Sequence, residues 1–307
     1  MKYARPLRDV PSVKNFLESL NFPIQKYPKI VSSIINTEKM LHTYDNNDST
    51  LISKSFRLSH VTEKERWELR TRIVEELTTQ RRLHDDDDIC LGKGGSLPTS
   101  EIKNERQAFL VIGLPASGKS SVSTIIAEKY GAVILDSDYA KRKLPEYEEF
   151  GASIVHEESN ALILGSSIMI GKPKDFRTLL ELASYEGSNI VIPKIGHSRD
   201  SIKQLVEVLI NTYKYNVHLT LISLDRSIAV TRAIHRFYYT KRYVPLSMIF
   251  DDYSNEPTNT YHKLKSENNQ LFKSFGIINT NVAPGKNGIC MECIGENPAD
   301  LFEKNQL

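Results

Sequence analysis

The stretch "QAFLVIGLPASGKSSVSTIIAEKYGAVILD", residues 107–136, decides the fold of this chain. It opens with the continuous apolar run 107–113, which is typical of a strand buried on both faces. Residues 120–131 follow with apolar side chains at helical spacing and end at a glycine, a common helix terminator. Residues 132–135 are again apolar. This order of strand, helix and strand predicts a βαβ unit.

The turn between the first strand and the helix matches the complete pattern G-x-x-x-x-G-K-[ST]. In such a loop the backbone N–H groups curl around a phosphate, Lys119 reaches the terminal phosphates and Ser120 offers a hydroxyl to Mg²⁺. Because the base-reading Asn-Lys-x-Asp of GTPases is absent after the loop, we predict ATP with Mg²⁺. The expected nucleotide contacts are Gly113, Pro115, Ala116, Ser117, Gly118, Lys119, Ser120 and Ser121.

Strands and helices alternate again after residue 187. The apolar runs 188–194, 217–225 and 275–281 are separated by the helical patterns 198–214 and 227–239. Strands separated by helices predict an α/β fold, a P-loop kinase-like parallel sheet flanked by helices.

The first hundred residues predict a mainly helical N-terminal extension and linker, with the kinase domain over 101–307. Residues 62–83 begin with a capping box, Thr62 and Glu65, and place Trp67 and Ile73 near one helical face. We expect the charged face of this helix to lie in solvent. The following "HDDDDICLGKGGSLP", residues 84–98, predicts an acidic, solvent-facing loop.

Composition excludes several classes of protein. The 307 residues carry 40 Lys and Arg against 38 Asp and Glu, so no global charge draws the chain to nucleic acid or an anionic membrane. Apolar runs are too short to cross a bilayer, and three cysteines are too few for a disulfide framework. We therefore expect a soluble cytoplasmic protein. Cys290 and Cys293 form one Cys-x-x-Cys pair, which favours ordinary thiols over a zinc site.

The segment "AVILDSDYAKRK", residues 132–143, carries two carboxylates at the end of a strand, where open α/β sheets bind ligands. We predict Asp138 as the general base for an acceptor hydroxyl and Asp136 as a metal-site residue. Helix capping is the alternative for Asp136. Arg142 lies one turn further and either meets substrate phosphate or is solvated.

Phosphoryl transfer also needs positive charge over the migrating group. In "TRAIHRFYYTKRYVP", residues 231–245, Arg232 and Arg236 lie four residues apart on one helical face, and Arg242 follows on a loop. This arrangement predicts a kinase lid with three catalytic arginines. A basic surface helix, with aromatic residues that touch nucleic acid, is the alternative.

These parts together resemble the zeta-toxin family of P-loop kinases over residues 107–280, through "GLPASGKSS", "VILDSDYAKRKLPEY" and "RAIHRFYYTKRYVP". Members are toxins of bacterial toxin–antitoxin systems that phosphorylate the 3′-hydroxyl of a uridine-diphosphate amino sugar. The resemblance implies that Asp138 is the base and that "GASIVHEESN" offers His156 and Glu157 to the substrate. It also implies an antitoxin or chaperone partner. A plain helix start is the alternative for the His-Glu-Glu sequence.

One segment departs from the family pattern. Where the family places an acidic and a hydroxyl residue after the middle strand, this chain has "IVIPKIGHSRD", with Lys194 and His197 as candidate acceptor contacts. The sequence also resembles zeta-toxin-like effectors of plant-pathogenic bacteria, which phosphorylate the adenosine ribose of NAD and are secreted into a host cell. A lysine suits a substrate with more exposed phosphate, so we place NAD before the sugar nucleotide. Local helix capping is the alternative for Lys194 and His197.

Two other classes stay open. A polynucleotide or nucleoside kinase also combines this loop with "DSDYAKR", although the near-neutral charge argues against a polymeric substrate. A non-catalytic nucleotide-binding module is the second, and the joint presence of Lys119, Ser120, Asp138 and the lid arginines argues against it.

Overall fold

The computed structural model describes residues 5–41, 43, 48–166, 168–169, 171–267, 269–283 and 285–304. Its α-helices are α1 (Val10–Ser19), α2 (Ile30–Leu41), α3 (Glu63–Thr79), α4 (Lys119–Tyr130), α5 (Ser137–Lys143), α6 (Glu146–Phe150), α7 (His156–Leu164), α8 (Leu179–Glu186), α9 (Arg199–Asn211), α10 (Arg226–Thr240) and α11 (Glu256–Glu267). Its strands are β1 (Gln107–Ile112), β2 (Val133–Ile134), β3 (Ile190–Lys194), β4 (Asn216–Ser223), β5 (Ser274–Asn279), β6 (Ile289–Ile294) and β7 (Glu303–Lys304).

The strands form one sheet in the order β2-β3-β1-β4-β5-β6-β7. The first five of these are parallel, so their carboxyl ends share one edge of the sheet. The predicted α/β fold with a parallel sheet is thereby confirmed. The sequence analysis missed β6, which runs antiparallel to β5 and carries Cys290 and Cys293, and the short β7 beside it.

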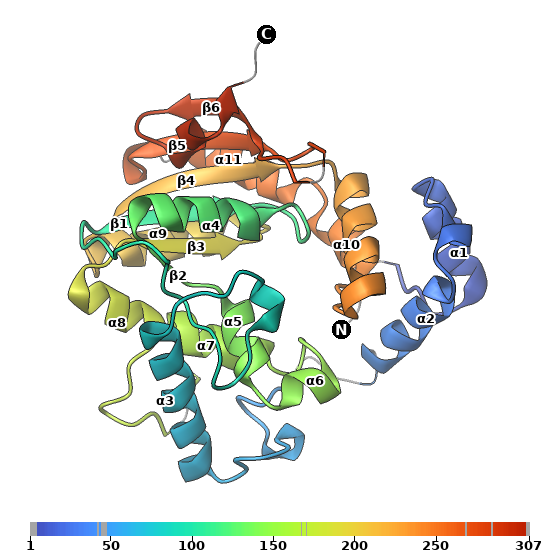
Figure 1. Ribbon diagram of the computed structural model, residues 1–307, viewed down its shortest axis with the longest axis horizontal. Coiled ribbons are helices and arrows are strands. Elements are labelled where there is room, and N and C mark those ends of the chain that lie inside the picture. The colour runs from blue at the N-terminus through green and yellow to red at the C-terminus, as the bar shows by residue number, and fades with distance from the viewer. Residues whose placement is uncertain are drawn as a thin grey trace.

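Helices cover both faces of the sheet (Figure 1). α4 packs on β1 and β3, whereas α9 and α11 pack on β4 and on each other. The chain leaves β1 toward β2 but leaves β3 toward β4 in the opposite direction, and right-handed crossovers then place α4 and α9 on opposite faces. The phosphate-binding loop therefore opens at the carboxyl edge between β1 and α4.

A cluster of helices lies beyond the β2 edge, where α3 contacts α5, α7 and α8 (Figure 1). The predicted helix and its capping box are confirmed in α3, and Trp67 and Ile73 are buried as expected. The expectation that the charged face of α3 lies in solvent holds for Lys64, Glu68 and Arg72, which are exposed, but is wrong for Arg66 and Arg70. Arg66 and Arg70 are 0% and 1% exposed, because neighbouring helices cover that face too.

The first two helices pack on α10 instead. Phe16 and Ile34 of α1 and α2 share a separate apolar cluster with Ile234 and Phe237. Figure 1 shows α1 and α2 beyond α10, away from the sheet. The apolar residues of α3, in contrast, belong to the cluster of the sheet itself. A domain boundary near residue 100 stays a prediction.

Candidate active site

The loop between β1 and α4 has the backbone shape that a phosphate cradle needs. Ala116 and Gly118 both have positive φ, at 59° and 91°, in the left-handed region that turns successive N–H groups inward. A Cβ atom added at Gly113 would lie 2.9 Å from Ser117 Oγ and 3.0 Å from Ile222 Cβ, so only glycine fits there. Ser120 and Ser121 lie exposed in the first turn of α4.

Lys119 is held over this loop. Its Nζ donates hydrogen bonds to the carbonyl oxygens of Gly113 at 2.8 Å and Leu114 at 2.6 Å. Burial lowers the pKa of Lys119 to about 8, although the carboxylates of Asp136 and Asp138 oppose that shift. The ammonium group therefore rests on carbonyl dipoles that a phosphate oxygen would replace.

The two aspartates after β2 occupy different environments. Asp136 caps α5, where its Oδ1 accepts a hydrogen bond from the backbone N–H of Asp138 at 2.9 Å. Burial, with the nearby charge of Asp138, raises the pKa of Asp136. The capping alternative is thus observed, but it uses Oδ1 alone, so the metal role stays a prediction.

Asp138 points its carboxylate at two cations. Oδ1 accepts from Lys141 Nζ at 2.8 Å, and Oδ2 accepts from Arg242. Burial opposes the shift, but Lys141 and Arg242 hold the pKa of Asp138 far below its usual range. In this arrangement the carboxylate is ionised and both of its oxygens are engaged by cations.

The lid arginines converge on the same edge of the sheet. Arg232 donates to the backbone oxygen of Thr280 at 2.7 Å, and Thr280 in turn donates to the oxygen of Ser117 at 2.6 Å. Arg232 is therefore tied to the phosphate loop through the end of β5. Arg236 has no hydrogen-bond partner for Nε, and burial together with Arg242 lowers its pKa to about 10.

Three predicted acceptor residues face this cluster. Lys194 ends β3 beside the phosphate loop, because its backbone oxygen accepts from Gly113 N at 3.2 Å. Burial lowers the pKa of Lys194. The charges of Lys141, Asp138 and Lys194 all affect the pKa of His156. Burial, with the charge of Lys141, lowers the pKa of His156 to about 4, so the ring is neutral.

Glu157, beside His156 in the first turn of α7, has a buried Oε2 without a partner among the described residues. Such an oxygen is free to accept a hydrogen bond from a bound molecule. His197 lies apart from these contacts; it is exposed, and its ring stands 5.2 Å from that of Tyr253. Among the described residues, His197 makes no hydrogen bond or ion pair with Asp138 or Lys194.

The acidic segment after α3 faces solvent at Asp85, Asp87 and Asp88 as expected, but it is not an unpaired loop. Asp86–Asp88 form a short 3₁₀ helix, and Asp87 accepts hydrogen bonds from both Arg142 and Arg242. Arg142 is thereby shown to be paired and only 5% exposed at its side chain. Its guanidinium also lies 3.4 Å from the backbone oxygen of Asp138.

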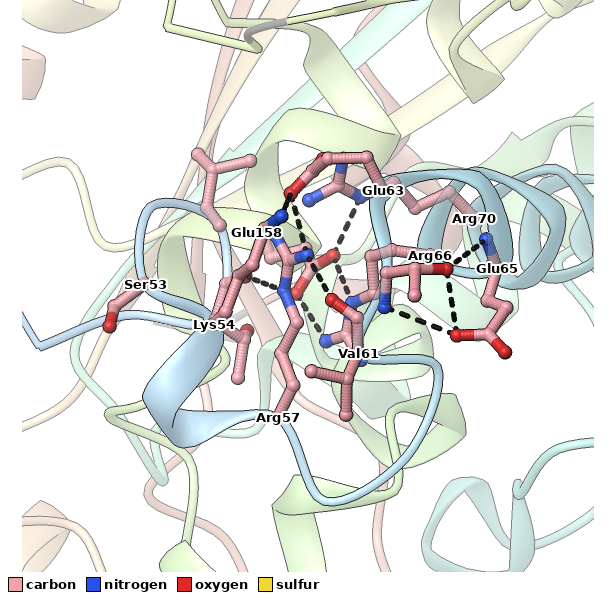
Figure 2. Close-up of polar contacts among 12 residues, drawn as sticks. Ser53, Lys54, Arg57, Val61, Glu63, Glu65, Arg66, Arg70 and Glu158 are labelled. Atoms are coloured by element: carbon pink, nitrogen blue, oxygen red, sulfur yellow. Dashed lines mark hydrogen bonds and ion pairs between the residues drawn. The ribbon is translucent and has the colours of Figure 1, made fainter.

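The helix that carries His156 and Glu157 is fixed from behind by α3. Arg66 donates to Glu158 at 2.8 and 2.5 Å and to Glu146 at 2.9 and 3.1 Å, and all three side chains are 0% exposed. Arg70 adds a bond to Glu158 at 2.7 Å. Figure 2 shows both arginines reaching from α3 to Glu158. The network therefore positions the first turn of α7.

Sequence reasoning missed three groups at this site: Asp87, Lys141 as a partner of Asp138, and Thr280. Lys141 lies one helical turn after Asp138, so helix spacing could have paired them. Asp87 and Thr280 come from segments far away in the chain, and no spacing rule connects them to the phosphate loop.

The sequence over residues 97–279 matches the family model for the zeta toxin. That match spans more than half of the chain and includes the phosphate loop, both aspartates and the lid. The chain belongs to the zeta toxin family. This zeta toxin family member is accordingly a P-loop phosphotransferase, as the resemblance implied. A search of curated proteins found no match.

Solved structures with a similar chain path include kinases and toxin complexes. One from the PezAT chromosomal toxin–antitoxin system of Streptococcus pneumoniae is 17% identical, covers 80% of this chain and 89% of its own, and has a TM-score of 0.48. A complex of AvrRxo1-ORF1 and AvrRxo1-ORF2 with sulphate ions is 16% identical over 78% of this chain and 70% of its own, with a TM-score of 0.41. A putative kinase from Chloroflexus aurantiacus is 17% identical over 48% and 77%, with a TM-score of 0.36.

Within the residues described, none of the helices is both long and apolar enough to span a bilayer. The thiols of Cys290 and Cys293 lie 3.6 to 3.7 Å from backbone oxygens.

Proposed function

We propose that this zeta toxin family member transfers the terminal phosphoryl group of ATP to the 3′-hydroxyl of the adenosine ribose of NAD. The proposal rests on the position of Asp138. It lies near the phosphate loop, among cationic side chains that outnumber the carboxylates around them. Arg236 Nε and the Lys194 ammonium have no hydrogen-bond partner among the described residues. Both side chains lie near the carboxylates of the site without a direct hydrogen bond to one, and such cations suit an acceptor that brings its own phosphates.

The donor side fits a nucleoside triphosphate. The left-handed backbone at Ala116 and Gly118 turns N–H groups toward one point, and the amino end of α4 adds its partial positive charge. Lys119 needs only to leave two carbonyl oxygens to reach a terminal phosphate. Arg232 and Arg236 lie on the one face of α10 that is tied to the same loop through Thr280.

The residues present also fit Mg²⁺. The exposed hydroxyl of Ser120 and the carboxylate of Asp136 are oxygen donors, which Mg²⁺ prefers, and neither is engaged by a lysine or arginine side chain. A bound Mg²⁺ ion would supply charge neutralisation of the phosphates. The pKa of Asp136 is raised because burial makes the charged form costly, and a bound cation would reduce that cost.

On the acceptor side, Asp138 would accept the proton of the ribose hydroxyl while that oxygen attacks the terminal phosphorus and the bond to the ADP oxygen breaks. Glu157 Oε2, buried without a partner, would accept a hydrogen bond from a neighbouring sugar hydroxyl. Lys194, where the family carries an acidic residue, would contact the acceptor diphosphate. These three roles use residues of β3, α5 and α7 that the carboxyl edge brings together.

The test is a phosphoryl-transfer assay with purified protein, Mg²⁺ and ATP. NAD, UDP-N-acetylglucosamine, a nucleoside and a 5′-hydroxyl oligonucleotide are offered separately, and added phosphate is read by mass spectrometry. We expect a product only from NAD, with the phosphate away from the 2′-hydroxyl. Transfer to the sugar nucleotide alone would contradict the acceptor assignment and leave the kinase chemistry intact. Asp138→Asn serves as the inactive control, and Asp88→Asn, exposed and without a side-chain contact, as its active counterpart.

We also propose a cognate antitoxin or chaperone, because an active toxin must be restrained in the cell that makes it. The family assignment supports this partner. Expression of the wild-type chain alone in a bacterial host should arrest growth, whereas Asp138→Asn should not. Equal growth of the two strains would contradict a toxic kinase.

A further inference from the structure

The carboxylate of Asp87 lies against two arginines of the site. Its Oδ1 accepts from the guanidinium of Arg142 and, at 2.9 Å, from that of Arg242. These donors come from α5 and from the loop after α10, whereas Asp87 comes from the segment after α3. Three distant parts of the chain therefore meet at one anionic group.

Both terminal nitrogens of Arg242 are occupied in this arrangement. One donates to Asp87 and the other to Asp138, so the two nitrogens that would bind a phosphate side by side are already paired with carboxylates. Arg142 likewise directs one nitrogen to Asp87 and the other to the backbone of Asp138. A carboxylate and a phosphate present similar pairs of oxygens to a guanidinium group. Asp87 thus takes the donors that a phosphate would take.

We propose that Arg142 and Arg242 form a subsite for a substrate phosphate, and that Asp87 occupies it as an internal substitute until a phosphorylated substrate displaces it. The inference rests on the proposed function and deepens it. Displacement of Asp87 frees Arg242, and the release of Arg242 from Asp138 frees the catalytic base. Substrate binding and activation of the base are then one event.

The segment that carries Asp87 is built to move without unfolding the core. The Asp87 side chain is 33% exposed, and the 3₁₀ helix of residues 86–88 has no buried residue. The Oδ1 atom of its neighbour Asp86 lies 3.6 Å from Nη1 of Arg82. This ion pair holds the other side of the segment. Asp87 can therefore leave the arginines while Asp86 stays in place.

Isothermal titration calorimetry with inorganic tripolyphosphate tests the subsite without any catalytic step. We expect Asp87→Asn to bind tripolyphosphate about fivefold more tightly than the wild type, the worth of one competing, partly exposed ion pair. Asp88→Asn removes the same charge one residue away, where the exposed side chain makes no hydrogen bond or ion pair with the described residues, and should bind as the wild type does. Adding Arg142→Gln to Asp87→Asn should abolish the gain. Circular dichroism melts confirm that each variant is folded.

Unchanged or weaker binding by Asp87→Asn would overturn the proposal, since Asp87 would then be neutral or would orient the arginines for the ligand. An equal gain in Asp88→Asn would also overturn it, because net charge alone would explain the effect. Failure of the proposed function looks different. Wild-type transfer to NAD with unchanged binding by Asp87→Asn refutes only the subsite, whereas tighter binding without transfer to any acceptor refutes only the NAD kinase.

Discussion

Replacing Arg66 with methionine should destabilise the protein far more than any exposed charge change on the same helix. Arg66 lies in α3 and donates four hydrogen bonds to Glu146 and Glu158, both 0% exposed. Figure 2 shows Arg66 beside Glu158. Methionine fills most of the volume but leaves the Glu146 carboxylate without its cation. Among the described residues, Glu158 keeps Arg70 as its paired cation.

The expected loss follows from the burial of these charges. Removing one partner of a buried ion pair costs about 3 to 5 kcal/mol, because the remaining charge stays desolvated and uncompensated. Arg72→Met is the matched control on α3. Arg72 is 57% exposed and pairs with Glu76 at i,i+4, a contact worth about 0.3 to 0.5 kcal/mol. The two variants should therefore differ by about 3 kcal/mol or more.

Urea unfolding followed by circular dichroism measures both free energies at pH 7. A second variant, Arg66→Met with Glu146→Gln, should recover at least about 1 kcal/mol, because the amide removes a buried charge. The reasoning is refuted if Arg66→Met loses no more than Arg72→Met. It is equally refuted if Glu146→Gln further destabilises the Arg66→Met protein, since the loss would then come from lost packing and not from an unpaired charge.

Four further outcomes follow from the site. Asp138→Asn should retain ATP affinity by calorimetry but lower kcat about 10²- to 10⁴-fold, the range of general-base catalysis, and an equal loss of ATP affinity would argue against the base role. Lys119→Ala should weaken ATP binding and turnover together, because Lys119 leaves loop carbonyls for phosphate; full ATP affinity in this variant would place its role elsewhere. Lys194→Ala should raise the KM for the acceptor, with Lys203→Ala, a partly exposed lysine of α9, as control, and unchanged KM and kcat would exclude an acceptor contact. Burial opposes it, but the Arg66 hydrogen bonds lower the pKa of Glu158 to about 2, so its contribution to stability is present above pH 4.5 and is lost as pH falls toward 2. The unfolding free energy of the wild type should therefore fall by about 3 kcal/mol more than that of Glu158→Gln across this range, and parallel curves would contradict it.

The parts of the fold that sequence reasoning found are those with local signals. The phosphate loop combines a fixed spacing with a buried strand before it and a helix after it, so its conformation was predictable residue by residue. The capping box of Thr62 and Glu65 likewise marked the start of α3. The strand β6 had no such signal. It mixes two cysteines and a glutamate with apolar residues, and it becomes a strand only because β5 offers an open edge.

The burial of Arg66 and Arg70 on α3 was missed for a different reason. A helix residue of arginine or glutamate type is ordinarily solvated, yet Arg66 is buried on the face that also carries Leu69 and Ile73, whereas Arg72 is exposed. The difference is made by Glu146 and Glu158, which are 80 and 92 residues away in the chain and reach the same side of α3. A pair of buried charges is thus a property of the assembled fold.

The candidate site follows the same division. Lys119, Asp138 and Arg242 were identified from motif and spacing, but the bond between the last two was not, since their segments meet only through the fold. That bond changes the chemistry of the resting site: Arg242 keeps Asp138 ionised yet engaged, and Asp87 holds Arg242 in place. A sequence motif can therefore point to the proposed base and the proposed cation of this kinase, whereas their pairing with each other and with Asp87 is visible only in the fold. Arg242 is the arginine proposed to stabilise the migrating phosphoryl group, and it is also the one that pairs with Asp138. We therefore expect little ATP hydrolysis until a substrate phosphate binds Arg142 and Arg242.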